Sequence, residues 1–291
     1  MKRFFVLFLF SCSGLKFELP SESPQPRPSD STYIRIDYKE FNDSILRIQV
    51  GPDGLLYVLF KDSLTRLYTN LNYEGFKIHS IARTFYISSD RSIYMVSDTI
   101  LSIYNYDGDL RISKKISNIP AYSICAFDSL RFVLSFYEKS RLVLYHRDSI
   151  YPLDTLAYEG NGILNVRKPM GIYCKDSIVF VASSGNNWVE GITLSKNSFV
   201  HLGGFSSNPS DSISKFNLPI DVSLDDNYGI FVLELNNRRF QKFNKYGDFI
   251  MVSRSPDTTI IPVSIAVSRD GKDLFVAYKY RIEKYRKPER P

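Results

Sequence analysis

The chain has 291 residues, 44% of them hydrophobic, which fits a folded protein of one large domain or two ordinary ones and excludes an intrinsically disordered chain. Gly and Pro together make about a tenth of the residues, which excludes collagen-like classes. Three Cys are too few for a disulfide-built scaffold or a typical four-ligand zinc site, and three His leave little room for a metal enzyme. The formal net charge of +6 is too small to indicate a nucleic-acid-binding surface.

The N-terminal segment predicts export. Lys2 and Arg3 precede an unbroken apolar run from Phe4 to Phe10, which is the arrangement of a short signal peptide. A helix of this length spans about 10 Å, far less than the ~30 Å hydrocarbon core of a bilayer, so the run is not a transmembrane helix. We expect residues 1–11 to be removed, and the loss of two basic residues then lowers the net charge from +6 to +4.

Cys12 is a candidate for lipidation. It follows Leu9-Phe10-Ser11, which resembles the lipobox of bacterial lipoproteins in its Leu and in the small residue before the cysteine, although Phe10 departs from the usual residue at its position. The alternatives are an ordinary signal peptide that is cleaved near Ser13 or Gly14 and an N-terminus that is not cleaved.

Residues 12–31 are expected to form a tether that carries the anchor. The part from 20 to 31 holds four Pro and no other apolar residue, a composition that favours extended polyproline geometry. The expected location is a membrane, facing the periplasm or the cell exterior, with contact to the bilayer only through the lipid on Cys12.

The rest of the chain is built from a repeat. Each copy has an aromatic residue followed by Val or Met, an apolar run about 12 residues upstream, and a third run that is followed by a turn and a fourth. The aromatic pairs recur at intervals averaging about 44 residues, at Tyr57-Val58, Tyr94-Met95, Phe132-Val133, Phe180-Val181, Phe231-Val232 and Phe275-Val276. Four strands in each such interval are typical of a β-propeller blade. The sequence therefore predicts an all-β, six-bladed β-propeller with four-stranded blades over residues 32–286, followed by a basic tail at 287–291.

The last blade is expected to close with a strand from the beginning of the propeller. Blade six has three apolar runs and then ends, whereas residues 33–38 form a β-prone run that has no place in blade one. Pairing the two completes the ring and removes an exposed strand edge.

Blades four and five resemble NHL repeats, a family of six-bladed propellers. Blade five matches the family pattern F-x-x-P, then V-A-D-x-x-N-x-R-I-Q-x-F, at Phe216, Pro219, Val232, Glu234 in place of Asp, Asn237, Arg239, Gln241 and Phe243. Blade four matches at Pro169, Gly171, Val181, Gly185 and Asn186, with Ser183 in place of Asp and Trp188 in place of Arg. Some six-bladed relatives are metal-dependent lactonases or peptide-amidating lyases, so the resemblance leaves an enzyme open.

Catalytic signals are weak, and we expect no catalytic residue and no bound cofactor. The chain has no G-x-S-x-G, P-loop or dinucleotide motif, and His79, His146 and His201 are expected to point away from the central channel. Asp221, at the head of a first strand, is the best single candidate for a Ca²⁺ ligand. Its alternative is a solvated or turn-bonded carboxylate.

Cys125 and Cys174 occupy equivalent positions in adjacent blades. Packed sheets lie about 10 Å apart, whereas the Cα atoms of a disulfide lie within about 7 Å. We therefore expect two buried free thiols that act as small apolar residues.

The predicted binding face is the one that carries the loops entering the first strands and the turns between second and third strands. Two of the entering loops are long, at residues 157–165 and 203–215, and insertions on one face often mark a binding face. The candidate residues on this face are Arg47, Tyr122, Glu138, Asn187, Trp188, Asp221, Glu234 and Asn237. Trp188 is either a part-exposed anchor for a partner or a residue packed between blades.

The expected function is non-catalytic binding of a protein, a peptide or a glycan in the cell envelope, centred on blades three to five and with no role for nucleic acid. The main alternative is a Ca²⁺-dependent lactonase- or lyase-like enzyme with its site at the channel mouth. A third possibility is a structural assembly subunit.

Overall fold

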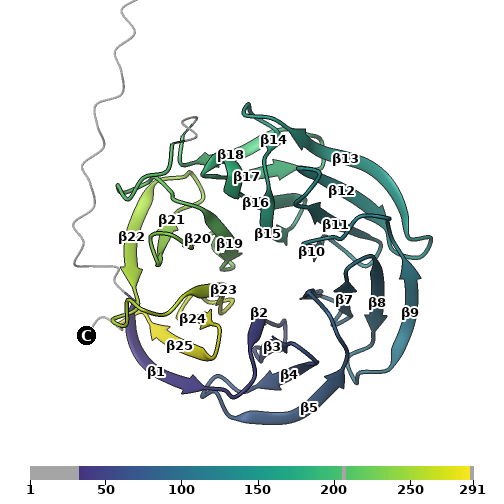
Figure 1. Cartoon of the computed structure of the whole chain (residues 1–291), viewed down its shortest axis with the longest axis horizontal. Coiled ribbons are helices and arrows are strands. Elements are labelled where there is room, and N and C mark those ends of the chain that lie inside the picture. The colour runs from purple at the N-terminus through teal and green to yellow at the C-terminus, as the bar shows by residue number, and fades with distance from the viewer. Residues whose placement is uncertain (1–32, 205–207, 289–291) are drawn as a thin grey trace, which may run out of the picture.

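The computed structural model describes residues 33–204 and 208–288, which form a six-bladed β-propeller (Figure 1). The predicted signal peptide, Cys12 and the tether lie outside the described residues, as do residues 205–207 of a long loop and 289–291 of the tail. Within the described part of the chain, no helix is long and apolar enough to cross a membrane.

Each blade is an antiparallel sheet of four strands, numbered here from the axis of the ring outwards. The strands of blades one to three are β2 (Ile45–Val50), β3 (Leu56–Phe60), β4 (Ser63–Leu67) and β5 (Tyr73–His79); β6 (Thr84–Ile87), β7 (Ile93–Ser97), β8 (Ile100–Tyr104) and β9 (Leu110–Lys115); and β10 (Ser123–Ala126), β11 (Arg131–Phe136), β12 (Arg141–His146) and β13 (Tyr151–Glu159), with β14 (Asn165–Val166) added in parallel to β13. Those of blades four to six are β15 (Pro169–Lys175), β16 (Ile178–Ser183), β17 (Trp188–Thr193) and β18 (Ser198–Leu202); β19 (Pro219–Leu224), β20 (Ile230–Glu234), β21 (Arg239–Phe243) and β22 (Phe249–Arg254); and β23 (Pro262–Val267), β24 (Asp273–Tyr278), β25 (Arg281–Arg286) and β1 (Ile34–Glu40).

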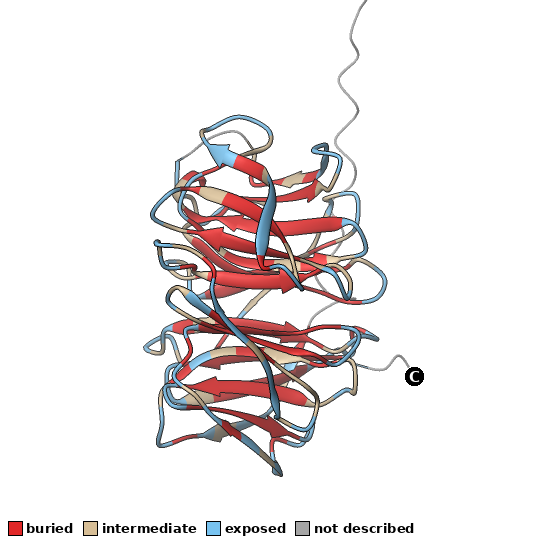
Figure 2. Ribbon diagram, turned by 90° about the vertical axis from the view of Figure 1, so that its right-hand side faces the viewer, coloured by how far each residue is buried: buried red, intermediate tan, exposed pale blue. Residues whose placement is uncertain are grey.

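The aromatic residues of the repeat form the core between blades. They lie on the second strands, and all six are fully buried: Tyr57, Tyr94, Phe132, Phe180, Phe231 and Phe275. Successive side chains of a strand point to opposite faces, so a strand buried on both faces carries a nearly continuous apolar run. Figure 2 shows this pattern as buried strands inside the ring and more exposed segments toward the outside.

The N-terminal strand closes blade six, as predicted. β1 pairs antiparallel with β25, from Ile34 opposite Arg286 to Glu40 opposite Arg281. Tyr33, directly before β1, is buried and packs edge-on against Phe231 of blade five, with ring centroids 5.6 Å apart. The closing strand therefore carries core contacts as well as main-chain pairing.

The first strands of the blades converge on the axis (Figure 1), and neighbouring first strands lie in contact. Serine side chains on first strands accept hydrogen bonds from backbone N–H groups of the next blade, as from Ile172 to Ser123 at 3.4 Å and from Val267 to Ser223 at 3.2 Å. This close approach shows why the expectation of free thiols is wrong. Cys125 and Cys174 form a disulfide with Cα atoms 5.4 Å apart, because the spacing of about 10 Å between packed sheets does not hold where strands converge on an axis.

Candidate functional site

One end of the ring carries the loops that enter the first strands and the turns between second and third strands, and we call it the mouth face. The strand register places these two sets together, since Ile45 at the start of β2 lies opposite Phe60 at the end of β3, and Pro219 lies opposite Glu234 in blade five. The candidate binding residues therefore share one end of the molecule, as expected from the topology.

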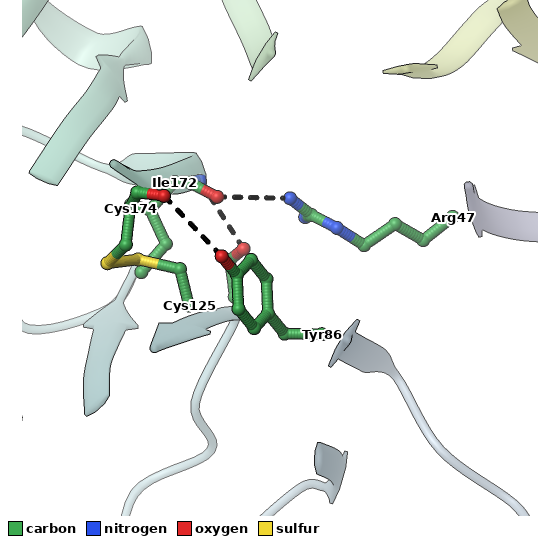
Figure 3. Close-up of a disulfide and its surroundings, with 6 residues drawn as sticks. Arg47, Tyr86, Cys125, Ile172 and Cys174 are labelled. Atoms are coloured by element: carbon green, nitrogen blue, oxygen red, sulfur yellow. Dashed lines mark hydrogen bonds between the residues drawn. A yellow bond between two sulfur atoms is a disulfide. The ribbon is translucent and has the colours of Figure 1, made fainter. Parts of the chain in front are cut away.

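Arg47 crosses the axis of the ring at this end. Its Nη2 atom donates to the carbonyl oxygen of Ile172 in blade four at 3.3 Å (Figure 3) and lies 3.1 Å from Oδ1 of Asp221 in blade five. The guanidinium group of blade one thus connects three blades.

Asp221 is buried, and both of its carboxylate oxygens have partners. Oδ1 also accepts the N–H of Val222 at 3.1 Å, and Oδ2 accepts the hydroxyl of Ser264 at 2.7 Å and the N–H of Ile265 at 3.1 Å. A Ca²⁺ ion needs six to eight oxygen ligands, and the described residues contain no group of three or more His, Cys, Asp or Glu able to hold a metal ion. The residues around Asp221 therefore do not fit a calcium site.

Tyr86 of blade two closes the channel beneath Arg47. Its hydroxyl group donates to the carbonyl oxygen of Cys174 at 3.4 Å, next to the disulfide (Figure 3). Its ring packs edge-on against Tyr173. Burial raises the pKa of Tyr86 well above its ordinary value, so the hydroxyl stays neutral and can donate. Only about 10 Å³ of free space remains between Arg47, Tyr86 and their neighbours. The channel is therefore divided into two separate mouths.

The mouth on the predicted face is a pocket of about 480 Å³. Its lining combines aliphatic side chains with basic ones and one tyrosine, and includes Leu46, Arg47, Lys61, Ile81, Arg83 and Tyr122. Burial raises the pKa of Tyr122, an effect that the positive charge of Arg47 opposes. The pocket lies mainly on blades one and two, whereas the sequence placed the centre of the face on blades three to five.

Trp188 is not an exposed anchor. Its side chain is fully buried at the start of β17 and packs edge-on against His201, with ring centroids 4.8 Å apart. The polar stretch before it is a single 3-10 turn, Ser184–Asn186, and Asn187 in the left-handed conformation (φ 54°) directs the chain into the strand. The Gly-Asn sequence therefore makes a tight turn that places the indole inside blade four.

The candidate residues of blade five anchor its entering loop. Glu234 is buried and pairs with Arg239, Nε to Oε1 at 2.6 Å, and also accepts hydrogen bonds from the side chain of Asn237 and the N–H of Asn217. Because Asp221 and Glu234 are both buried and paired with arginines, neither presents a free carboxylate on this side of the mouth face. The residues that resemble the NHL motif hold the loop in place.

The remaining two candidates lie apart from these groups. Asn187 accepts the backbone N–H of Leu218 through Oδ1 at 2.8 Å, which connects blade four to the loop that enters blade five. Glu138 is exposed on the turn between β11 and β12. Arg47, Tyr122 and Asp221 are thus brought together near the axis, and the others are not part of that group.

A polar position on the third strand was missed by sequence reasoning. Opposite the Val of the aromatic pair, blades four, five and six carry the buried residues Glu190, Gln241 and Glu283. Each one bonds the loop that enters its own blade: Glu190 accepts the N–H of Leu164, Gln241 that of Ser214, and Glu283 the hydroxyl of Ser255. The signal available in the sequence was a Glu or Gln at the same position of the third strand in three successive blades.

The polar residue of blade five, Gln241, helps to hold the long loop at 203–215. Gln241 donates to the carbonyl oxygen of Lys215 at 2.7 Å, and the guanidinium group of Arg239 donates to those of Asp211, Ser212 and Lys215. The described part of the loop is therefore held by blade five.

The equivalent polar residue of blade four is Glu190. Burial raises the pKa of Glu190, an effect that the bond from Leu164 opposes.

Comparison with known proteins supports the fold and gives no family. No protein-family model matches the chain, and no curated protein matches it in sequence. Among solved structures, a streptogramin B lyase is similar with a TM-score of 0.60 and 14% sequence identity, over 87% of this chain and 98% of that one. At this identity the similarity shows the six-bladed propeller fold alone, and the NHL resemblance stays at the level of the motifs.

Proposed function

We propose that this chain is a non-catalytic binding protein of the cell envelope that uses the pocket on its mouth face to hold a protein or peptide. The observation that carries the proposal is the pocket of about 480 Å³, which is open to solvent at a place where the channel below is closed. Pockets of about 300–1,000 Å³ with apolar walls and a few polar groups are the usual form of ligand sites.

Export and lipid anchoring are part of this proposal. The basic and apolar N-terminal residues support a signal peptide, and the disulfide between Cys125 and Cys174 is of a kind that persists in oxidising compartments. Those two cysteines bond to each other, which leaves Cys12 as the third and supports its role as the lipid attachment residue.

The enzymatic alternative has less support. It needs a divalent ion at the mouth of the channel, and the carboxylate best placed for one is neutralised by Arg47 and bonded through both oxygens. A metal at Asp221 would have to displace the guanidinium group and break contacts that hold three blades together.

Metal analysis separates the two functions. We expect full-length protein purified in detergent to contain no stoichiometric divalent ion and to keep its Tm when EDTA is added. One ion per chain, with a lower Tm after chelation, would overturn the binding proposal in favour of the enzyme.

Site-specific photo-crosslinking in intact cells tests whether a partner binds at the mouth face. A photoreactive residue at Ile81, in the pocket, should give adducts, whereas one at Leu110 on the outer strand of the same blade should not. Both side chains are exposed aliphatic ones, at 76% and 54%, so they form a matched pair. Adducts from Leu110 alone would contradict the assignment.

The anchor is tested by Cys12→Ser. This variant should lose its lipid and leave the membrane fraction, whereas the disulfide cysteines should have no such effect. A Cys12→Ser variant that remains in the membrane fraction would show that the anchor lies elsewhere.

A further inference from the structure

The pocket on the mouth face has an apolar body. Its floor includes Ile220 and Val263 at the starts of two first strands, and its rim includes Leu46 and Ile81, which are 38% and 76% exposed. Large aliphatic side chains exposed next to a concave site favour a ligand that brings an apolar group to cover them. A strongly hydrated ligand such as a bare phosphate would leave this surface in contact with water.

Basic groups outnumber acidic ones around the same pocket. Lys61 and Arg83 stand at its edge, and the one acidic side chain of the lining, Asp98, pairs with Arg83 at 3.2 Å. Both members of that pair are more than half exposed, so it contributes little and can be exchanged for a ligand. In the part of the chain that the structure describes, no carboxylate lies within 4.0 Å of the Lys61 ammonium group.

Arg47 supplies donors at the inner wall. Its contacts to Asp221 and to the carbonyl oxygen of Ile172 are both made through Nη2, so its Nε–H and Nη1–H groups remain for a ligand. The side chain is 14% exposed, and its ion pair with Asp221 already holds it at the pocket wall. It therefore needs no further ordering when a ligand binds. A pre-positioned guanidinium group is well suited to a carboxylate, with which it can form short charge-assisted hydrogen bonds.

Tyr122 forms a rigid aromatic wall. Its ring stacks on Tyr137 with centroids 5.6 Å apart, which fixes its orientation. The pocket thus combines an aliphatic floor, an aromatic wall and basic groups at the inner wall and the edge.

We propose that the pocket binds a monocarboxylate that carries an apolar group, in the form that the C-terminal residue of a peptide presents. The carboxylate lies between Arg47 and Lys61, and the apolar side chain covers Ile81 and Tyr122. A backbone arriving from solvent is accommodated because the pocket is open on the outer side. This inference rests on the proposed function and names the ligand chemistry for the same site.

Fluorescence anisotropy with labelled pentapeptides tests the inference on full-length protein in detergent. A peptide ending in Leu-Phe with a free carboxylate should bind, and its C-terminal amide should bind at least tenfold more weakly. N-acetylphenylalanine is the second arm: if it competes as strongly as the peptide, the source is a free small carboxylate, and if it competes weakly, the source is a peptide end.

Lys61→Glu and Lys77→Glu form a matched pair of variants. Both residues are exposed lysines of blade one, but Lys77 lies on the outer strand β5. Lys61→Glu should weaken the free-carboxylate peptide at least tenfold and leave the amide unchanged, whereas Lys77→Glu should change neither. Equal binding of acid and amide, equal effects of the two variants, or no binding at millimolar peptide would each overturn the inference. These outcomes are separate from the metal analysis, which alone decides between binding protein and enzyme.

Discussion

The guanidinium group of Arg47 in blade one and the carboxylate of Asp221 in blade five meet across the axis of the ring, with Nη2 and Oδ1 3.1 Å apart. The two side chains are 14% and 3% exposed, so the pair is largely removed from water. Since Asp221 also accepts bonds from blade six, its charge is held by side-chain and backbone donors from three blades. Asp221, which best matched a metal ligand in the sequence, therefore connects blades one, five and six.

Arg47→Met tests this role. The substitution leaves the Asp221 carboxylate buried without its cation, and we expect a loss of about 3–5 kcal/mol in the free energy of unfolding, the usual cost of breaking a buried ion pair from one side. Urea unfolding followed by the fluorescence of the single, buried Trp188 measures it.

The double variant Arg47→Met with Asp221→Asn is the control. It removes both charges, so it should recover a large part of the lost stability. A single variant as stable as wild type would contradict the structural role of the Arg47–Asp221 pair. A double variant that loses the sum of both single effects would contradict it as well.

The strand order could be predicted from the sequence because a propeller repeats one pattern. The spacing of the aromatic pairs identified the six second strands, and the unpaired run at 33–38 identified the closing strand β1. Both predictions depend only on strand position along the chain, which hydrophobic patterning records directly.

The site could be predicted only in part, because its contacts depend on distances between blades. The sequence placed Arg47, Tyr122 and Asp221 on one face, but not Arg47 across the axis from Asp221. The sequence left Trp188 either part-exposed or packed between blades, because a Gly-Asn stretch indicates a turn and does not say which way the next side chain points. The disulfide was missed because the distance between first strands is set by the closed ring.

The disulfide should stabilise the fold by linking the first strands of blades three and four. Cys125 and Cys174 are 49 residues apart, and closing a loop of that length contributes about 2–4 kcal/mol. The double variant Cys125→Ser, Cys174→Ser should lose that amount in urea unfolding. Reduction of the wild type should lower its stability to the value of the variant, and the variant should not respond to reductant.

Alkylation under denaturing but non-reducing conditions gives an independent readout. Mass spectrometry should find no label on Cys125 or Cys174 before reduction and a label on both afterwards. Labelling of both before reduction would contradict the bond.

Closure of the ring predicts unequal effects of two N-terminal deletions. Loss of residues 32–40 removes β1 and the buried Tyr33 and should prevent folding or lower the Tm by more than about 10 °C, whereas loss of residues 20–30 should leave the Tm unchanged. Because the first deletion can abolish folding, Tyr33→Ala is the second test. It should cost about 3–5 kcal/mol, as other buried aromatic truncations do. Equal Tm values for the two deletions would refute closure by β1.

The carboxylate of Asp273 should make the fold sensitive to acid. Oδ1 lies 2.7 Å from Nε of Arg286, and Oδ2 lies 3.0 Å from its Nη2 and 2.9 Å from Nζ of Lys284. Burial acts to raise the pKa of Asp273, but the bonds from Arg286 and Lys284 outweigh it and hold the pKa below its ordinary value. These contacts join β24 to β25, the strand on which β1 closes the ring.

The sign of the pH effect follows from the lowered pKa. A carboxylate that is more acidic in the folded state contributes stability that is present above the pKa of the unfolded chain, about 3.9, and is lost as the pH falls through the folded value. Asp273→Asn should therefore be about 1–3 kcal/mol less stable than wild type at pH 7, and the difference should shrink as the pH falls below about 4. Asp98→Asn is the matched control, since Asp98 pairs with Arg83 at 3.2 Å but both side chains are more than half exposed. An exposed pair contributes less than about 1 kcal/mol, so this variant should track wild type across the whole range. Urea unfolding from pH 3.5 to 7 measures both, and an Asp273→Asn difference that grows with acid would reverse the assigned sign.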